Sequence, residues 1–259
     1  MRMPTMRTTA LLLAATMAGC APMTAISEMP ALEGTAWTLT SLPGHELGST
    51  SAPTLRFEDG RASGGDGCNR YSMPYALEGG RLDLSGPAMS TEMACPPEVM
   101  KRAAAYLAAL RGSTGYRIED GRLELLGADG KLRLTLAAQS QTLAGTSWRA
   151  SGINNGRNAV VSVVLGSEVT IAFGADGRAS GSAGCNNFTA GYEASAPQLK
   201  FTAPASTRKM CESEDVMRQE QAFLTALPTV ATMRFEGDRL ELRRADGALA
   251  VALMRDKGK

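Results

Sequence analysis

Short apolar runs separated by turn residues recur along most of the chain, and their lengths suit β-strands. Pro53–Phe57 and Val169–Phe173 are two such runs, and each leads into an Asp-Gly turn, at Asp59 and at Asp176. The segment Arg122–Leu136 alternates polar and apolar residues on both sides of another Asp-Gly turn, as a hairpin with one buried face does. The pattern predicts antiparallel strands joined by tight turns.

One segment in each half of the chain has helical periodicity instead. Glu98–Leu110 and Glu214–Leu227 each place their large apolar residues near one face. Glu98 in the first segment, and Glu214 with Asp215 in the second, fall in the first turn, where the helix dipole favours negative charge. Each half is therefore predicted to be an α+β unit of about five to eight strands and one helix.

The two halves of the chain repeat each other. Gly34–Trp37 matches Gly145–Trp148, and Asp59–Gly64 matches Asp176–Gly181. The order continues with Gly67-Cys68-Asn69 and Gly184-Cys185-Asn186, with Ser90-Thr91 plus Cys95 and Ser206-Thr207 plus Cys211, and with Arg122–Leu125 and Arg239–Leu242. Most matched residues are 117 positions apart, but the two tryptophans are 111 apart, so the second copy carries six extra residues near its start.

A repeat of this length indicates a duplicated domain and not a solenoid. We expect the first domain at residues 33–137 and the second at 145–254, with a linker at 138–144. Residues 1–19 are expected to be a lipoprotein signal peptide, and residues 20–32 a tether of small and polar residues.

The N-terminal segment has the features of an export signal. Two arginines precede an apolar stretch, Ala10–Met17, that is too short to span a bilayer as a stable helix. It continues into Met17–Cys20, which resembles a bacterial lipobox, so cleavage before Cys20 and acylation of its thiol are expected. Ala21 favours sorting to the outer membrane, with the protein facing the periplasm. The alternative is an ordinary secretory signal, which leaves Cys20 either removed or free.

Composition and charge argue against some partners. Lys and Arg number 27 against 26 Asp and Glu, so no broad basic surface for phosphate backbones is expected. Aromatic residues are only 5% of the chain, which also disfavours stacking on bases. Nucleic acid is therefore not an expected partner, and the acyl chains at Cys20 are the one membrane attachment that we predict.

The repeated blocks resemble the META domain family, which includes the heat-shock protein HslJ. The resemblance is carried by Gly-Thr-x-Trp, by Asp-Gly-Arg-x-Ser-Gly-x-x-Gly-Cys-Asn and by Ser-Thr-x-x-x-Cys before a helix, and it covers both copies. It implies a curved, mostly antiparallel sheet packed on one helix, and a link to stress tolerance, novobiocin resistance, motility or secretion, but no known reaction. The second copy departs from the family pattern because Glu212, and not Pro, follows its last cysteine.

The remaining four cysteines fall as one pair in each copy, and four cysteines allow three disulfide pairings. The duplication favours Cys68–Cys95 and Cys185–Cys211, because each copied domain then forms a disulfide from its own two cysteines. Each bridge would contribute roughly 3 to 4 kcal/mol in the chain-entropy model. Buried free thiols are an alternative, whereas a metal bound by four thiolates would need short paired spacings that are missing from the sequence.

Residues that could support catalysis are few. The only histidine, His45, lies in a Pro-Gly-His turn of the first copy and has no counterpart in the second, and no Gly-x-Ser-x-Gly sequence accompanies it. Several aspartates lie in glycine-rich turns, where Asp favours the turn itself. These turn aspartates are Asp59, Asp66, Asp129 and Asp246. We therefore expect no enzyme activity, no metal and no cofactor.

The asparagines that follow the first cysteine of each pair, Asn69 and Asn186, are the polar residues of most interest. Each amide can tie neighbouring turns together or contact a ligand. The expected function is that of a non-enzymatic envelope lipoprotein that binds a protein partner or a small apolar ligand in envelope stress tolerance. The alternatives are a periplasmic carrier of lipid or hydrophobic drug, which needs an apolar cavity, and a hydrolase that uses turn carboxylates.

Overall fold

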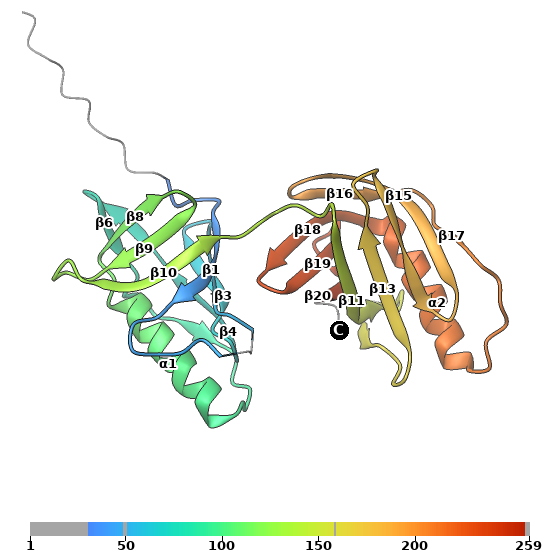
Figure 1. Cartoon of the computed structure of the whole chain (residues 1–259), viewed down its shortest axis with the longest axis horizontal. Coiled ribbons are helices and arrows are strands. Elements are labelled where there is room, and N and C mark those ends of the chain that lie inside the picture. Colours follow the sequence, from blue (N-terminus) through green and yellow to red (C-terminus); the bar gives the residue numbers. More distant parts are fainter. Residues whose placement is uncertain (1–30, 49–50, 158, 257–259) are drawn as a thin grey trace, which may run out of the picture.

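A computed structural model describes residues 31–48, 51–157 and 159–256. Within these ranges the chain forms two domains that lie beside each other and are joined by one extended connection (Figure 1). Each domain is mostly antiparallel β-sheet with one α-helix. The predicted signal peptide at 1–19, the acylation site at Cys20 and nearly all of the tether at 20–32 lie outside the described residues.

The first domain has one eight-stranded sheet and a separate two-stranded hairpin. The order across the larger sheet is β7-β4-β3-β2-β1-β10-β9-β8, and β5 pairs with β6. The elements are β1 (Ala36–Ser41), β2 (Thr54–Glu58), β3 (Arg61–Gly65), β4 (Arg70–Pro74), β5 (Ala76–Glu78), β6 (Arg81–Asp83), β7 (Met89–Ser90), α1 (Pro97–Arg111), β8 (Gly115–Glu119), β9 (Arg122–Leu126) and β10 (Leu132–Ala138).

The second domain repeats this order with one sheet that closes on itself. The elements are β11 (Thr146–Asn154), β12 (Val160–Ser162), β13 (Glu168–Phe173), β14 (Arg178–Gly184), β15 (Asn187–Ser195), β16 (Gln198–Phe201), β17 (Ala205–Ser206), α2 (Glu214–Ala226), the 3-10 helix η1 (Leu227–Thr229), β18 (Val230–Glu236), β19 (Arg239–Arg244) and β20 (Leu249–Arg255). Strand β11 pairs with both β13 and β20, and β16 pairs with β18 through Gln198 and Thr232. These pairings complete a ring of strands.

Each helix packs against the inner face of its own sheet, and the two cores are separate clusters. In the first domain the largest buried side chains include Phe57 and Tyr106, and in the second they include Trp148, Phe173 and Phe223. Fully burying such a side chain contributes about 1.5 to 3 kcal/mol. The amphipathic faces predicted from the sequence therefore supply the contacts that hold helix to sheet.

The repeated glycines are explained by backbone geometry. Gly64 lies so close to the neighbouring strand that a Cβ atom there would be 2.1 Å from the carbonyl oxygen of Thr54. Gly181 has the same relation to Thr170, again at 2.1 Å. Only glycine allows this approach, so both copies retain it at the end of the Asp-Gly-Arg-Ala-Ser-Gly block.

The Gly-Thr-x-Trp block forms one small hydrogen-bonded unit in each domain. Gly34 adopts a φ of +78°, which favours glycine, and the hydroxyl of Thr35 donates to a backbone carbonyl and accepts a 2.7 Å bond from the indole Nε1 of Trp37. Thr146 and Trp148 form the same 2.7 Å bond in the second domain. The block therefore satisfies the polar edge of a tryptophan whose ring is buried.

The predicted α+β fold is confirmed in part. One helix per domain and a mostly antiparallel arrangement are found, but the described residues form ten strands in each domain, not five to eight. The additional strands are two or three residues long, namely β5, β6, β7, β12 and β17. Segments this short carry no detectable period, since their pairing is decided by the longer strands beside them. Neither helix is long and apolar enough to cross a membrane.

The two domains contact each other through the β18–β19 hairpin. The guanidinium of Arg70 in β4 forms ion pairs with Glu236 and, at 2.8 Å, with Glu241 of the second domain. Arg56 donates a 3.1 Å hydrogen bond to the carbonyl oxygen of Phe235. Glu241 is only 2% exposed and also pairs with arginines of its own domain, so the first domain contributes one cation to a buried charge network.

Candidate functional site

The asparagine after each first cysteine holds the segment that carries the second cysteine. The side-chain oxygen of Asn186 accepts hydrogen bonds from the hydroxyl of Thr207 at 2.7 Å and from the backbone N–H of Lys209 at 2.8 Å. Asn69 accepts in the same way from Thr91 at 2.9 Å and from the N–H of Met93 at 2.7 Å. In both domains the amide oxygen therefore ties two neighbouring segments together.

The disulfides complete this clamp. Cys68 is bonded to Cys95 and Cys185 to Cys211, which is the pairing favoured by the duplication. The sulfurs of Cys185 and Cys211 lie near the carboxylate of Glu220, with ligand atoms within 4.8 Å of one another. Both sulfurs are bonded to each other, however, and Glu220 accepts hydrogen bonds from Asn186, so this group serves the clamp.

Three of the four turn aspartates accept hydrogen bonds from backbone N–H groups of their own turns. Asp66 is 3% exposed and accepts from the N–H groups of Cys68 and Asn69 at 2.8 and 2.6 Å. Asp129 and Asp246 each accept a hydrogen bond from the N–H two residues further on, and this lowers the pKa of both carboxyls. These carboxylates are spread over separate turns and do not form a catalytic pair.

His45 lies on the surface of the first domain. It is exposed, and its backbone takes part in an isolated bridge with Leu42. Within the described part of the chain, no serine or cysteine side chain forms a hydrogen bond with the imidazole of His45. The structure therefore brings none of the sequence-predicted polar residues into a common pocket.

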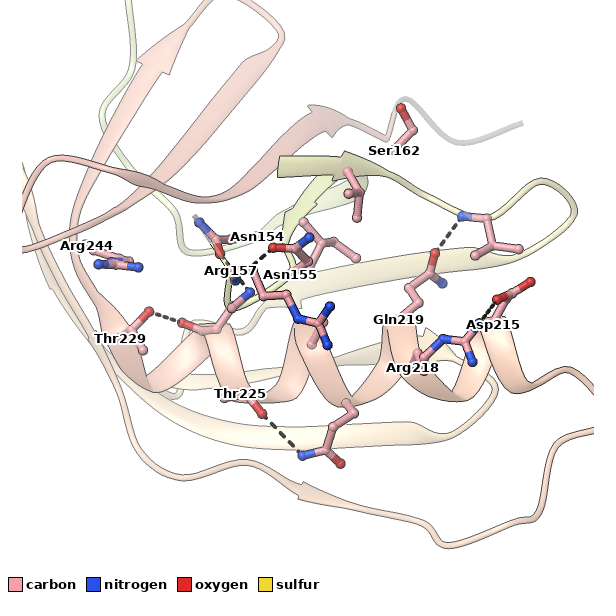
Figure 2. A pocket seen from close by; sticks show the side chains of 17 residues that line it. Asn154, Asn155, Arg157, Ser162, Asp215, Arg218, Gln219, Thr225, Thr229 and Arg244 are labelled. Carbon is pink, nitrogen blue, oxygen red and sulfur yellow. Dashed lines mark hydrogen bonds and ion pairs between the residues drawn. The ribbon is translucent and has the colours of Figure 1, made fainter. Parts of the chain in front are cut away.

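A cavity of about 700 Å³ lies instead in the second domain, between α2 and the hairpin formed by β11 and β12. Figure 2 shows the side chains of the hairpin above those of the helix. The apolar part of the lining comes from Ile153, Val161, Val164, Ala222 and Ala226. A volume of this size falls within the range of small-molecule sites.

Polar side chains in the cavity wall hold the wall together. Asn154 is 6% exposed, donates to the carbonyl of Leu249 at 3.1 Å and accepts from the N–H of Gly156 at 2.9 Å. Gln219 is 8% exposed, accepts from the N–H of Val164 at 2.6 Å and donates to the hydroxyl of Ser167 at 2.7 Å. The helix is thereby fastened to the chain that leaves β12.

Three arginines and one aspartate bring charge to the lining. Arg218 forms ion pairs with Asp215 and, at 3.7 Å, with Glu214, while Arg244 forms an ion pair with an aspartate outside the cavity. Arg157 reaches from the hairpin loop over the cavity toward α2 (Figure 2). The cavity therefore joins an apolar wall to a rim of charged side chains.

Sequence analysis did not predict this cavity, although one signal pointed to it. The six extra residues of the second copy fall largely between Trp148 and Val169, and they build the longer β11 and its partner β12. An insertion in one of two copies marks where their structures must differ. It does not by itself show that the difference is a cavity.

Comparison with known proteins agrees with the repeat. A family model described as the META domain matches residues 30–140 and again residues 141–257. Among solved structures, the NMR structure of a protein from Burkholderia xenovorans matches this chain with 29% sequence identity and a TM-score of 0.35. The match covers 42% of this chain and 85% of the Burkholderia chain. A second NMR structure is 23% identical over 40% of this chain and 87% of its own, with a TM-score of 0.32.

A crystal structure of a DUF4847 family protein from Bacteroides vulgatus is 14% identical, covers 46% of this chain and 98% of its own, and has a TM-score of 0.32. None of the curated proteins matches this chain. The two family matches together extend over all of the described residues. The chain therefore belongs to the META domain family and carries two META domains in tandem.

Proposed function

We propose that this protein is a non-enzymatic envelope lipoprotein that binds a small ligand with an apolar body in its second META domain. The observation that carries the proposal is the cavity of about 700 Å³, whose wall includes apolar side chains of both α2 and the β11–β12 hairpin. The lipobox supports acylation at Cys20 and a position on the outer membrane facing the periplasm. The META family supports a role in envelope stress tolerance.

The chemistry of the described polar groups agrees with binding rather than catalysis. A catalytic site needs an acid, base or nucleophile that faces a cleft and is free to exchange a proton. Three of the turn aspartates, the two asparagines and Gln219 are engaged in hydrogen bonds that shape turns or fasten the helix. The cavity has shape and apolar surface but lacks such a reacting pair among its described side chains.

A protein partner is a second candidate, and exposed apolar residues on β12 favour it. Val160 and Val161 are 44% and 45% exposed, and Leu165 on the following loop is fully exposed. Strand β12 lies at the end of the strand order of its sheet, so its outer edge could pair with another chain. This surface adjoins the cavity, and a partner there would cover its hairpin wall.

Native mass spectrometry of the protein extracted gently from its own envelope tests the proposal. Covalent acyl groups at Cys20 add a mass that survives denaturation, whereas a ligand in the cavity adds a mass that denaturation removes. The variant Ala222→Trp fills the cavity from α2 and is expected to lose only the second mass. Met217→Trp is the matched control, because Met217 is an exposed residue of the same helix that does not line the cavity.

Retention of the removable mass by wild type and by Met217→Trp, with its loss from Ala222→Trp, would support the proposal. Wild-type protein that carries only covalent lipid, and that takes up no added apolar ligand, would overturn it. In that case crosslinking through Val160 or Leu165 would test the protein-partner alternative.

A further inference from the structure

We propose that the ligand of this cavity is a single-chain anionic amphiphile whose carboxylate or phosphate headgroup is bound by Arg157 and whose apolar chain lies along α2. This inference rests on the proposed function for the cavity itself, and it adds the chemical class of the occupant. Its basis is a difference among the three arginines of the lining.

Arg218 and Arg244 are already neutralised. Arg218 pairs with Asp215 and Glu214 on its own helix, and Arg244 pairs with Asp246. Arg157 has neither an ion pair nor a side-chain hydrogen bond with any residue that the structure describes. Among the described residues that line the cavity, its guanidinium is thus the one cation that is available to an incoming anion.

The backbone below Arg157 is fixed, although its side chain is exposed. The N–H of Arg157 donates to the side chain of Asn155 at 2.9 Å, and the N–H of Gly156 donates to Asn154 at 2.9 Å. Gly156 has a φ of +75°, a left-handed conformation that favours glycine at this turn. Two consecutive side-chain-to-backbone bonds therefore position the start of the arginine side chain before any ligand arrives.

The remaining polar atoms of the wall are mostly committed to each other. Gln219 is held by Val164 and Ser167, and the hydroxyl of Thr229 donates to a backbone carbonyl of the helix end. A neutral polar ligand would therefore find few free partners. An amphiphile suits the site better, because its chain needs only the apolar wall and its headgroup needs only the guanidinium.

Arginine also fits this headgroup chemically. Its planar guanidinium presents paired N–H donors that match the two oxygens of a carboxylate or phosphate. The carboxylates of Asp215, Glu214 and Asp246 pair with Arg218 and Arg244, so the attraction for an anion comes from Arg157 and not from the net charge of the rim. An anion is attracted to this guanidinium, whereas a cationic amphiphile is repelled.

Fluorescence titration of the mature full-length protein with cis-parinaric acid and with its methyl ester tests this inference. The two probes share one apolar chain and differ only in headgroup charge. We expect wild type to bind the acid about tenfold more tightly than the ester, since a charge-assisted pair exceeds a neutral contact by roughly this factor. Arg157→Gln should remove this preference and leave ester binding unchanged.

Arg178→Gln is the matched control. It removes the same charge from an exposed position of the second domain that does not line the cavity. It should keep the full preference for the acid. Thermal unfolding of each variant verifies that the fold is retained, and competition by dodecanoate or by dodecyl phosphate distinguishes a carboxylate from a phosphate headgroup.

The outcomes separate the two proposals. Equal binding of acid and ester by wild type, or an unchanged preference in Arg157→Gln, would overturn the anionic headgroup while leaving the cavity function intact. Failure of wild type to bind either probe would overturn both. Two results together would support both proposals. Ala222→Trp should lose binding of the acid and of the ester, and Arg157→Gln should lose the preference for the acid.

Discussion

The two META domains share their motifs but differ in how the first strand continues. In the first domain β1 ends at Ser41, whereas in the second β11 runs on to Asn154 and turns into β12. The longer hairpin forms one wall of the cavity. The comparison teaches that the duplicated framework tolerates an insertion at this place, because the insertion adds an edge strand and leaves the strand order of the framework unchanged.

The copies also satisfy the asparagine clamp with carboxylates from different elements. In the first domain the N–H of Asn69 donates to Asp66 of the loop after β3, and the matching position in the second domain is Ala183. There the N–H of Asn186 donates to Glu220 of α2, at 2.8 Å. The hydrogen bond is common to both copies, whereas the residue that accepts it is not.

The helix contacts show a similar exchange. Tyr71 and Tyr106 have hydroxyls 2.8 Å apart, and both donate to the carbonyl of Thr54. The matching residues of the second domain are Phe188 and Phe223, whose rings pack edge to face at 5.3 Å between centroids. At this pair of positions the first domain thus uses buried hydroxyls, whereas the second uses apolar ring contact.

Among the changes that test this comparison of the two domains, removal of a disulfide should have the largest effect on the free energy of unfolding. Cys185→Ser with Cys211→Ser is expected to cost the second domain about 3 to 4 kcal/mol in free energy of unfolding, and Cys68→Ser with Cys95→Ser should cost the first domain a similar amount. Urea unfolding followed by separate domain probes measures both losses. Alkylation of unreduced, denatured wild type should label none of the four cysteines, and stoichiometric labelling would contradict the bridges.

The exchanged carboxylates allow a transplant. Glu220→Ala should destabilise the second domain by about 1 to 3 kcal/mol, because buried donors of Asn186 lose their acceptor. Adding Ala183→Asp places the acceptor where the first domain has it and should restore part of this loss. If the double variant is no more stable than Glu220→Ala, the two clamps are not equivalent.

The tyrosine pair should give a smaller change. Tyr106→Phe in the first domain is expected to cost about 1 kcal/mol, because the hydroxyl of Tyr71 keeps the carbonyl of Thr54 as acceptor. Introduction of Phe at both tyrosines would leave that carbonyl without either hydroxyl donor, although the second domain shows that two phenylalanine rings pack in this arrangement. Urea unfolding of both variants measures the difference, and a loss of several kcal/mol from Tyr106→Phe alone would contradict it.

The charge network between the domains should produce the smallest effect, visible as a pH dependence. Burial raises the pKa of Glu241, but the arginines around it, Arg243 and Arg70, outweigh burial and leave its pKa below the ordinary 4.5. A lowered pKa means that the stabilisation is present above about pH 4.5 and is lost as the pH falls through the folded-state value. Denaturant unfolding of wild type and Glu241→Gln between pH 7 and pH 3 measures this, and the variant should show the weaker acid dependence.

Much of the fold follows from local sequence. The Asp-Gly turns, the two helices and the tryptophan blocks each depend on residues a few positions apart, so the pattern of the chain predicts them. The pairing of cysteines follows from the repeat, because copies of one domain must bond alike. The roles of Asn69 and Asn186 stayed open, since a sequence does not show which backbone groups an amide will meet.

The sequence by itself determined two META domains, their helices and their matched cysteines. It did not determine the short edge strands, the closure of the second sheet, the contact of Arg70 with Glu241 or the cavity beside α2. Those features arise where segments distant in the chain approach one another, as β11 does with β20 and the hairpin loop with the helix. Only the tertiary structure shows that Arg218 and Arg244 are neutralised by neighbours while no described residue neutralises Arg157, because the neutralisation of a charge depends on distances in space.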